Sequence, residues 1–409
     1  MKKALAVLLA VIMAATLVAC KKGKNETDEP PEEQPTANNS QTPAPQPPQQ
    51  SATIPPPEPA DEEFGVRYID FGYTPSAEQF SRPEYHLAHI VMVHTPQTQM
   101  MVNLYGNIGT KMNFTITSYS SYRDADLFIN LIETTAELGM DGMIIDATFA
   151  LQDRVFEITD ELGIIYMPGL STYATVDGKF LRPSAALDNY RMGSGCLDYM
   201  LDNYAKHTGV AFVADNIGLI TVEYGANKDY NARRDGAADA YKAAYPRQMN
   251  TNYFNLDTAD EPTQMTADAA YSMVAETVTE NTQITGWLVF GVAEDFADGA
   301  SKALEDMGYG ETSLVTCVSV DKLAQRWDAG YDGCWVACAD TPAIQWAHAT
   351  ICGLMQLIEG KANPQTLWQQ YKDSGQDYTV IMLPFSIVDK ANHDDYTESI
   401  NQYINRLFT

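Results

Sequence analysis

The sequence is poor in features that mark several large classes of protein. Lys and Arg together number 26 of 409 residues, against 54 Asp and Glu, which gives a formal net charge of −28. This balance argues against binding to nucleic acid and against electrostatic docking on anionic lipid. The chain also has no GxSxG, HExxH, P-loop or GxGxxG motif. We therefore expect neither an enzyme nor a protein that needs a cofactor or metal.

Cysteine is scarce as well. Beyond Cys20 there are five cysteines, none with CxxC spacing, and an odd number cannot all pair: Cys196, Cys317, Cys334, Cys338 and Cys352. Cys334 and Cys338 lie four apart in a predicted strand, where both side chains would face one side. A structural zinc site would need closer pairs and nearby His. We expect buried thiols, with a disulfide or a metal site as alternatives.

Long hydrophobic runs are confined to the start of the chain. Lys2 and Lys3 precede an apolar segment of about fifteen residues, which suits a signal peptide and is short for a membrane span. It ends in Leu17-Val18-Ala19-Cys20, which resembles the lipobox of bacterial lipoproteins, where the Cys is diacylated and becomes the new N-terminus. We expect a signal peptide over 1–19 and lipidation of Cys20, with a plain secretory signal as the alternative.

Residues 20–63 have the composition of a disordered tether. They hold eleven of the 21 prolines and almost no large apolar side chains, so they cannot form a core. At about 3 Å per residue in a polyproline-like conformation, the contour of this segment exceeds roughly 100 Å. We therefore expect an extracytoplasmic domain that is lipid-anchored to the cell membrane and held clear of it.

From about residue 64 onward the composition is that of a globular protein. Some 345 residues exceed one ordinary domain, so two lobes are expected. Apolar strand patterns, such as 114–118 and 217–222, alternate with helical patterns, such as 124–138 and 267–281. This alternation predicts an α/β protein with two doubly wound parallel-sheet lobes, each sheet covered on both faces.

Four segments carry a resemblance to a known family. They are 187–193 with an Asp-Asn-x-x-x-Gly motif, 233–241 with Arg-x-x-Gly, 290–300 with a sequence like Asn-Asp-x-x-Ala-x-Gly-Ala, and 333–361. A segment near the C-terminus, 380–392, adds a fifth. In this order they are similar to the type I periplasmic-binding-protein family, in particular the substrate-binding lipoproteins of ribose- and galactose-type ABC importers. The resemblance implies three hinge crossings, with lobe 1 at 64–187, lobe 2 at 188–338, a return to lobe 1 at 339–381, and a C-terminal crossing and end of lobe 2 at 382–409.

The predicted ligand site lies where strands end. Ligands of parallel α/β sheets bind beyond the carboxyl ends of the strands, where helix N-termini offer unpaired N–H groups. Two facing lobes would close on a small molecule at these ends. The predicted ligand-binding residues are Thr95, Gln97, Tyr122, Asp146, Thr148, Tyr173, Arg233, Glu294, Ser319 and Asp340.

The resemblance adds roles to some of these residues. It implies that Arg233 grips the ligand, with Arg234 as the alternative, because a guanidinium is a rigid fork of donors. Glu294 is placed where sugar binders carry Asn, and its carboxylate would also suit an amine-bearing ligand. The strand end that usually reads Gly-Phe-Asp has Ser319 last here, so the Asp that grips a sugar hydroxyl is absent or shifted to Asp321.

These features predict a solute-binding lipoprotein. It would act as a monomer, capture a small polar, sugar-like ligand by hinge closure, and deliver it to an ABC transporter permease. The alternative is a ligand-sensing lipoprotein that signals to a membrane receptor or kinase. A surface enzyme would be indicated only by measured turnover. The export signal, and the absence of a basic DNA-binding segment before the domain, argue against a repressor of the same fold.

Overall fold

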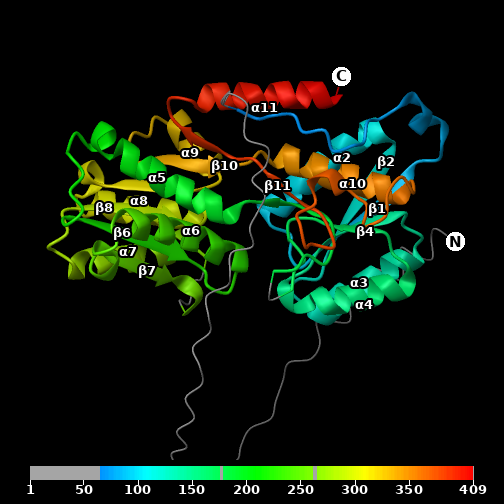
Figure 1. Ribbon diagram of the computed structural model, residues 1–409, viewed down its shortest axis with the longest axis horizontal. Coiled ribbons are helices and arrows are strands. Elements are labelled where there is room, and N and C mark those ends of the chain that lie inside the picture. The colour runs from blue at the N-terminus through cyan, green and yellow to red at the C-terminus, as the bar shows by residue number, and fades with distance from the viewer. Residues whose placement is uncertain (1–64, 176–177, 261–264, 409) are drawn as a thin grey trace, which may run out of the picture. The chain divides into compact units, whose positions relative to one another are not determined.

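The computed structural model describes residues 65–175, 178–260 and 265–408 (Figure 1). The predicted signal peptide, Cys20 and the predicted tether lie outside the described residues. In the part that is described, no helix is both long and apolar enough to cross a membrane.

Lobe 1 is built on a four-stranded parallel sheet in the order β2-β1-β3-β4. Its strands are β1 (Tyr85–Val91), β2 (Phe114–Ser120), β3 (Gly142–Asp146) and β4 (Tyr166–Pro168). Its helices are α2 (Pro96–Met112), α3 (Ala125–Glu137), α4 (Gln152–Leu162) and α10 (Ala343–Ile358), with the two-stranded parallel sheet β5 (Ser184–Leu187) and β11 (Val380–Leu383) beside them.

Alternate residues of the same strands fill two separate cores in lobe 1. Leu87 and Ile144 pack with α2 and α10 on one face, whereas Ala88 and Ile145 pack with α3 and α4 on the other. Successive side chains of a strand point to opposite faces, so continuous apolar strands serve both cores. The helix α4 ends at Gly163, whose φ of 64° suits the left-handed C-cap position.

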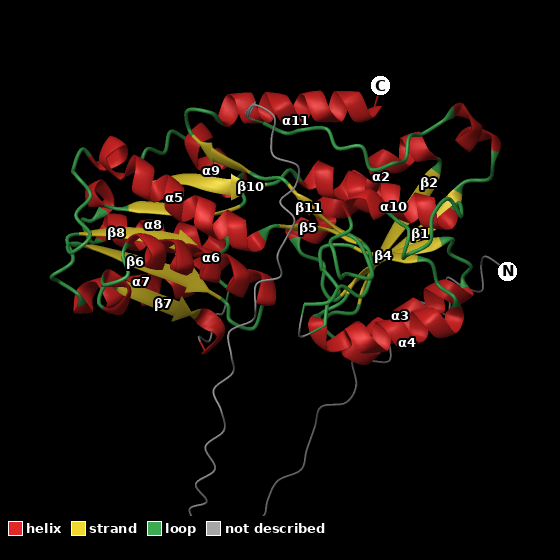
Figure 2. Cartoon of the chain, viewed as in Figure 1, coloured by secondary structure: helices red, strands yellow, loops and turns green. Residues whose placement is uncertain are grey.

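Lobe 2 is built on a six-stranded sheet in the order β12-β10-β9-β8-β6-β7. Figure 2 labels four of these strands, β10, β8, β6 and β7. Its strands are β6 (Ile217–Glu223), β7 (Tyr253–Asp257), β8 (Gly286–Gly291), β9 (Leu314–Val318), β10 (Trp335–Asp340) and β12 (Ser386–Asp389). Its helices are α5 (Asn189–Thr208), α6 (Lys228–Ala244), α7 (Ala267–Glu280), α8 (Glu294–Asp306) and α9 (Asp321–Asp328). All strand pairs are parallel except β10 with β12. The predicted fold class, an α/β protein with two parallel-sheet lobes, is confirmed.

The last helix, α11 (His393–Phe408), packs on both lobes. Tyr396 belongs to the core of lobe 2, Tyr403 belongs to the core of lobe 1, and Ile400 between them contacts both. The sequence assigns this whole segment to the end of lobe 2, whereas the structure shows its second half against α10 of lobe 1. Tyr403 there bonds Nδ1 of the buried His348 at 2.9 Å.

The first strand and the cysteines show how register sets local detail. β1 spans Tyr85–Val91, since its register with β2 starts at Tyr85 and the chain leaves the sheet before α2. All five described cysteines are buried thiols. Cys334 and Cys338 do not face a common partner, since the register of β10 shifts between Trp335 and Ala337.

Candidate functional site

Arg233 stands at the carboxyl edge of the lobe 2 sheet. Its Nε donates to Oδ1 of Asn189 at 2.7 Å, and its Nη1 donates to the carbonyl oxygen of Val292 at 2.8 Å. It lies 5.2 Å from the ring centre of Tyr230. Burial lowers the pKa of the guanidinium from its usual value, against the neighbouring Tyr230 and Asp229. The predicted ligand-gripping residue is thus held in one position by two helices and a strand end.

Two glycines allow the close approach of α5 and α6 that sets this position. A Cβ added at Gly193 would lie 1.8 Å from the carbonyl oxygen of Arg233, and one at Gly236 would lie 1.9 Å from that of Tyr190. Neither position therefore accepts a side chain without moving a helix. This contact gives a physical reason for the glycines of the two motifs, which the sequence presents only as spacing.

Three carboxyl groups, those of Glu294, Asp321 and Asp340, gather around the turn between β9 and α9. Glu294 accepts a hydrogen bond from the backbone N–H of Lys322. Burial raises the pKa of Glu294 to about 7, opposed by that hydrogen bond and supported by the nearby charges of Asp321 and Asp340. Asp340 accepts from the Tyr396 hydroxyl at 2.7 Å, and burial raises its pKa to about 6. Lobe 2 therefore offers one fixed guanidinium and two carboxyl groups with raised pKa values, those of Glu294 and Asp340.

Two positions next to these acids, Ala293 and Ser319, depart from the motifs of the resembling family. Counted back from Gly299 and Ala300, the amide position of the motif falls on Ala293, so Glu294 occupies the acidic position and not the amide position expected for it. Ala293 is the N-cap residue of α8 and has no polar side chain with which to cap it. Ser319 has a φ of 79°, which is unusual for a residue with a side chain, and its N–H donates to the Ala339 carbonyl oxygen at 2.9 Å.

In lobe 1, some predicted residues lie at the carboxyl edge. Thr95 is the N-cap of α2, and its hydroxyl accepts from the Thr98 N–H at 3.1 Å. Gln97 and Thr148 are exposed beside the ends of β1 and β3. Tyr122 follows β2, is 80% exposed, and has a φ of 53°. The backbone N–H of Tyr122 donates to the Ser120 hydroxyl at 3.2 Å, while its ring projects from the loop.

Asp146 and Tyr173 instead lie in the interior of lobe 1. Oδ2 of Asp146 lies 2.9 Å from Nε2 of the buried His89, and Oδ1 accepts from the Leu170 N–H. The other His89 nitrogen lies 3.1 Å from the Ser118 hydroxyl. Tyr173 is fully buried and donates to the Ile145 carbonyl oxygen at 2.9 Å. Both predicted ligand residues therefore make contacts within lobe 1.

Two features of this edge were not predicted from the sequence. The ammonium nitrogen of Lys228, the first residue of α6, lies 3.2 Å from the ring centre of Phe149, which follows β3. Gln152, at the start of α4, is 4% exposed, and its Nε2 donates to the Thr172 carbonyl oxygen at 3.4 Å. Its Oε1 has no hydrogen-bond partner among the described residues. The sequence signal for the contact between Lys228 and Phe149 is the position of Phe149, directly after the loop that ends a predicted strand.

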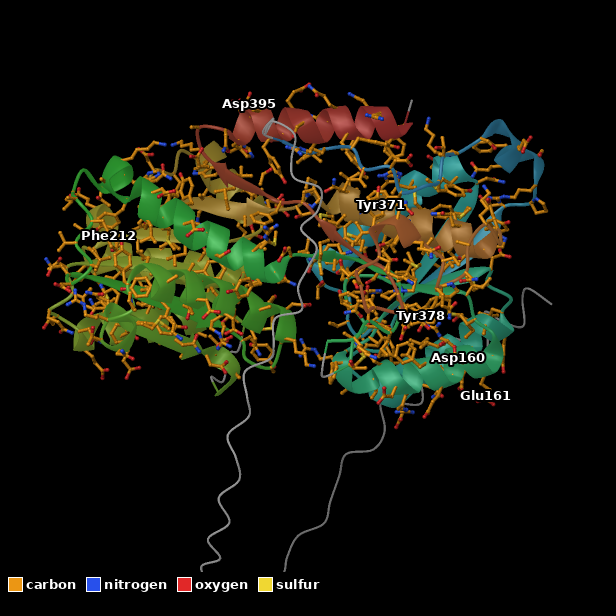
Figure 3. The ribbon with its side chains drawn as sticks, viewed as in Figure 1. Asp160, Glu161, Phe212, Tyr371, Tyr378 and Asp395 are labelled. Atoms are coloured by element: carbon orange, nitrogen blue, oxygen red, sulfur yellow. The ribbon has the colours of Figure 1, made fainter. Side chains whose placement is uncertain are left out.

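A cavity of about 400 Å³ lies at a different place, where β4 begins. It is lined by Asp160, Tyr166, Arg182, Leu357 and Pro364, among others. Figure 3 labels Asp160 on α4. Its carboxylate pairs with Arg182 at 2.6 Å. This cavity is at the amino end of a strand, so it is not the predicted ligand site. The described residues contain no group of three or more His, Cys, Asp or Glu side chains that could hold a metal ion.

Solved structures of other proteins are similar to this fold. A periplasmic solute-binding protein of an ABC transporter from Actinobacillus succinogenes, solved with bound D-allose, has a TM-score of 0.57 at 16% identity over 77% of this chain and 100% of that chain. A solute-binding protein from Bacillus halodurans with bound myo-inositol gives 0.57 at 12% identity over 78% and 98%. The fructose-binding periplasmic domain of a hybrid two-component system gives 0.57 at 13% over 79% and 98%.

These neighbours are binding proteins, and the likeness at such low identity establishes the fold. The chain has the fold of the type I periplasmic binding proteins. No protein-family model matches the sequence, and no curated protein matches it.

Proposed function

We propose that this chain is an extracytoplasmic solute-binding lipoprotein, which captures a small polar solute between its two lobes and delivers it to an ABC importer. The observation that carries the proposal is Arg233, held by Asn189 and the Val292 carbonyl oxygen at the carboxyl edge of the lobe 2 sheet. A partly buried guanidinium in a fixed position offers directed donors to a hydroxyl or carboxylate. Structural neighbours solved with sugars or an inositol favour a sugar-like solute.

Ligand binding tests this proposal directly. A bound solute should raise the melting temperature of the purified protein, because a ligand that binds only the folded state stabilises it by mass action. Replacement of Arg233 by Ala should weaken binding at least tenfold in calorimetry. Arg154→Ala is the matched control, since Arg154 pairs on the surface with Asp126. If no member of a broad panel of sugars, polyols, nucleosides and amines shifts the melting curve, the proposal loses its main support.

The lipid anchor is a separate part of the proposal. It rests on the Leu17-Val18-Ala19-Cys20 sequence after an apolar segment. Mass spectrometry of protein extracted from cells should find a chain that begins at Cys20 and carries a diacylglyceryl group. Cys20→Ser should release the protein from the membrane fraction. An unmodified chain cut at another residue would contradict the anchor and leave solute binding intact.

Sensing is the second candidate function. One structural neighbour is the periplasmic domain of a hybrid two-component system, so this fold also serves signalling. Uptake of a labelled ligand distinguishes the two roles. Loss of uptake after deletion of the gene supports transport. Intact uptake together with loss of a transcriptional response to the ligand supports sensing.

A further inference from the structure

A hydrogen-bond relay of four side chains crosses the sheet of lobe 1. Nε2 of His89 on β1 lies 2.9 Å from Oδ2 of Asp146 at the end of β3, and its Nδ1 lies 3.1 Å from the hydroxyl oxygen of Ser118 on β2. The same hydroxyl oxygen lies 3.1 Å from Nε2 of His94. The three strands are neighbours in the order β2-β1-β3. The relay therefore joins the fully buried His89 to the exposed His94.

The donors and acceptors of the relay fit together in one direction when His89 is neutral. An ionised carboxylate only accepts, so Nε2 of His89 donates to Asp146. Nδ1 of the neutral imidazole is then an acceptor, and the Ser118 hydroxyl donates to it. The Ser118 oxygen in turn accepts from the Nε2–H of His94. A doubly protonated His89 would reverse the last two bonds and would put a second charge in the interior, where each charge loses its hydration.

Nδ1 of His94 is the exposed end of the relay. Within the described ranges this nitrogen makes no hydrogen bond, and since Nε2 carries the proton, Nδ1 is an acceptor. His94 follows β1 and directly precedes Thr95, the N-cap of α2. It therefore lies at the carboxyl edge of the sheet, where ligands of parallel α/β folds bind. Lobe 1 presents an acceptor at this edge, whereas the guanidinium of Arg233 in lobe 2 offers only donors.

The amino end of the same two strands holds a comparable pair of side chains without a relay. Nδ1 of His86 lies 2.9 Å from the hydroxyl oxygen of Thr115, and both residues are exposed. Among the described residues, no second imidazole bonds the Thr115 hydroxyl, so nothing fixes the direction of this pair. The Ser118 hydroxyl differs because the buried His89 holds it from the interior. His86 is therefore a matched control for His94.

We propose that His94 determines the specificity of the solute site, because its Nδ1 accepts a hydrogen bond from a hydroxyl group of the solute. Ser118 and His89 are positioning residues, which hold the ring of His94 and fix its tautomer. This inference rests on the proposed function and specifies the chemical class of its ligand: a polyhydroxy solute with a free hydroxyl group at this place. A methyl ether has no donor, so it would leave Nδ1 unpaired.

Nitrogen NMR tests the direction of the relay without a solute. In the ¹⁵N-labelled full chain at mildly alkaline pH, couplings between ring nitrogens and carbon-bound ring protons show which nitrogen of each histidine is protonated. We expect His89 and His94 each to carry one proton, on Nε2. Ser118→Ala should leave the proton of His89 in place and turn His94 into a mixture of tautomers, whereas the signals of His86 should not change. A proton on Nδ1 of His94 in the unchanged protein overturns the proposal.

Solute binding tests the role of His94. The probes are D-ribose, D-galactose and myo-inositol, each with its mono-O-methyl ethers. We expect at least one parent compound to bind in calorimetry, and one of its ethers to bind about tenfold more weakly. His94→Ala should weaken binding of the parent about fivefold, the usual size of one hydrogen bond, and should abolish the preference over that ether. His86→Ala should leave both affinities within about twofold.

The positioning role of Ser118 has its own measurement. Ser118→Ala should weaken binding of the parent compound less than His94→Ala does, and Ser118→Thr, which keeps the hydroxyl group, should restore it. If His94→Ala binds the parent compound and its ethers as the unchanged protein does, the proposal is overturned and solute binding stands. If none of the probes binds, the hydroxyl assignment is overturned, and the broad panel described above decides the proposed function.

Discussion

Polar side chains end the strands of both lobes, but the two lobes use them differently. In lobe 1, Asp146 ends β3 and turns inward to His89 and the Leu170 N–H. In lobe 2, Asp340 ends β10 in the same way, yet its carboxylate stays at the edge beside Asp321 and is bonded by the Tyr396 hydroxyl. The position of an acid at a strand end therefore does not decide its role. The available partner decides it.

The pKa values of Glu294 and Asp340 in lobe 2 also depend on the groups around them. Within the described part of the chain, neither Glu294 nor Asp340 forms an ion pair, and burial and neighbouring acids raise the pKa of each, to about 7 and about 6. Each retains a proton in the folded protein at a pH where it would be ionised in the unfolded chain. Stability from these groups is therefore greatest below the ordinary pKa of a carboxyl and falls as the pH rises toward 7. The fold is therefore less stable when these two carboxyl groups of lobe 2 are charged.

The largest expected effect on stability tests the structural role of Asp146. Asp146→Ala leaves the buried His89 and the Leu170 N–H without their acceptor, and we expect it to lower the free energy of unfolding by about 3 kcal/mol. Asp126→Ala is the control, because the Asp126 carboxylate is 85% exposed and its pair with Arg154 should contribute less than about 0.5 kcal/mol. Urea denaturation of both variants measures the difference.

Solute binding by the same variant tests whether Asp146 belongs to the ligand site. If Asp146 has only the structural role described here, Asp146→Ala should still bind the solute once it is folded at low temperature. If Asp146→Ala keeps its stability but no longer binds the solute, Asp146 belongs to the ligand site, as the sequence predicts.

The sequence predicts the fold well because periodicity reports burial. Strands with continuous apolar residues and helices with one apolar face follow from local pattern, and glycine stops such as Gly163 follow from backbone preference. The two-lobed architecture then follows from the order of the elements. Local pattern does not report the partner of α11, whose lobe 1 contacts join residues distant in sequence, such as Tyr403 and His348.

The site is less predictable for a related reason. Motif spacing places Arg233 and Glu294 at strand ends of lobe 2, where their role in binding stays a prediction. The inward turn of Asp146 depends on His89, which lies 57 residues earlier in the chain. The bulge in β10, which separates Cys334 from Cys338, leaves no signal in composition. The unpaired oxygen of Gln152 depends on the Thr172 carbonyl group 20 residues away. Each of these roles is set by a neighbour in space that a single sequence does not identify.

A smaller effect tests how lobe 2 holds Arg233, the proposed ligand-binding residue. In Gly193→Ala, the new Cβ would meet the Arg233 carbonyl oxygen at 1.8 Å, so α5 and α6 must separate. We expect a loss of about 2 kcal/mol in the free energy of unfolding, the usual size of an overpacking effect. Because the displaced element carries Arg233, we also expect solute binding at least fivefold weaker in calorimetry at a temperature where the variant is folded.

The matched control lies in lobe 1. Gly106 is also inside a helix, α2, but no atom lies within 4 Å of a Cβ added there. Gly106→Ala should therefore stabilise the protein by about 0.5 kcal/mol through helix propensity and leave binding unchanged. If both glycine variants behaved alike, the contact between α5 and α6 would not be what positions Arg233, and the guanidinium would depend on Asn189 and the Val292 carbonyl oxygen alone.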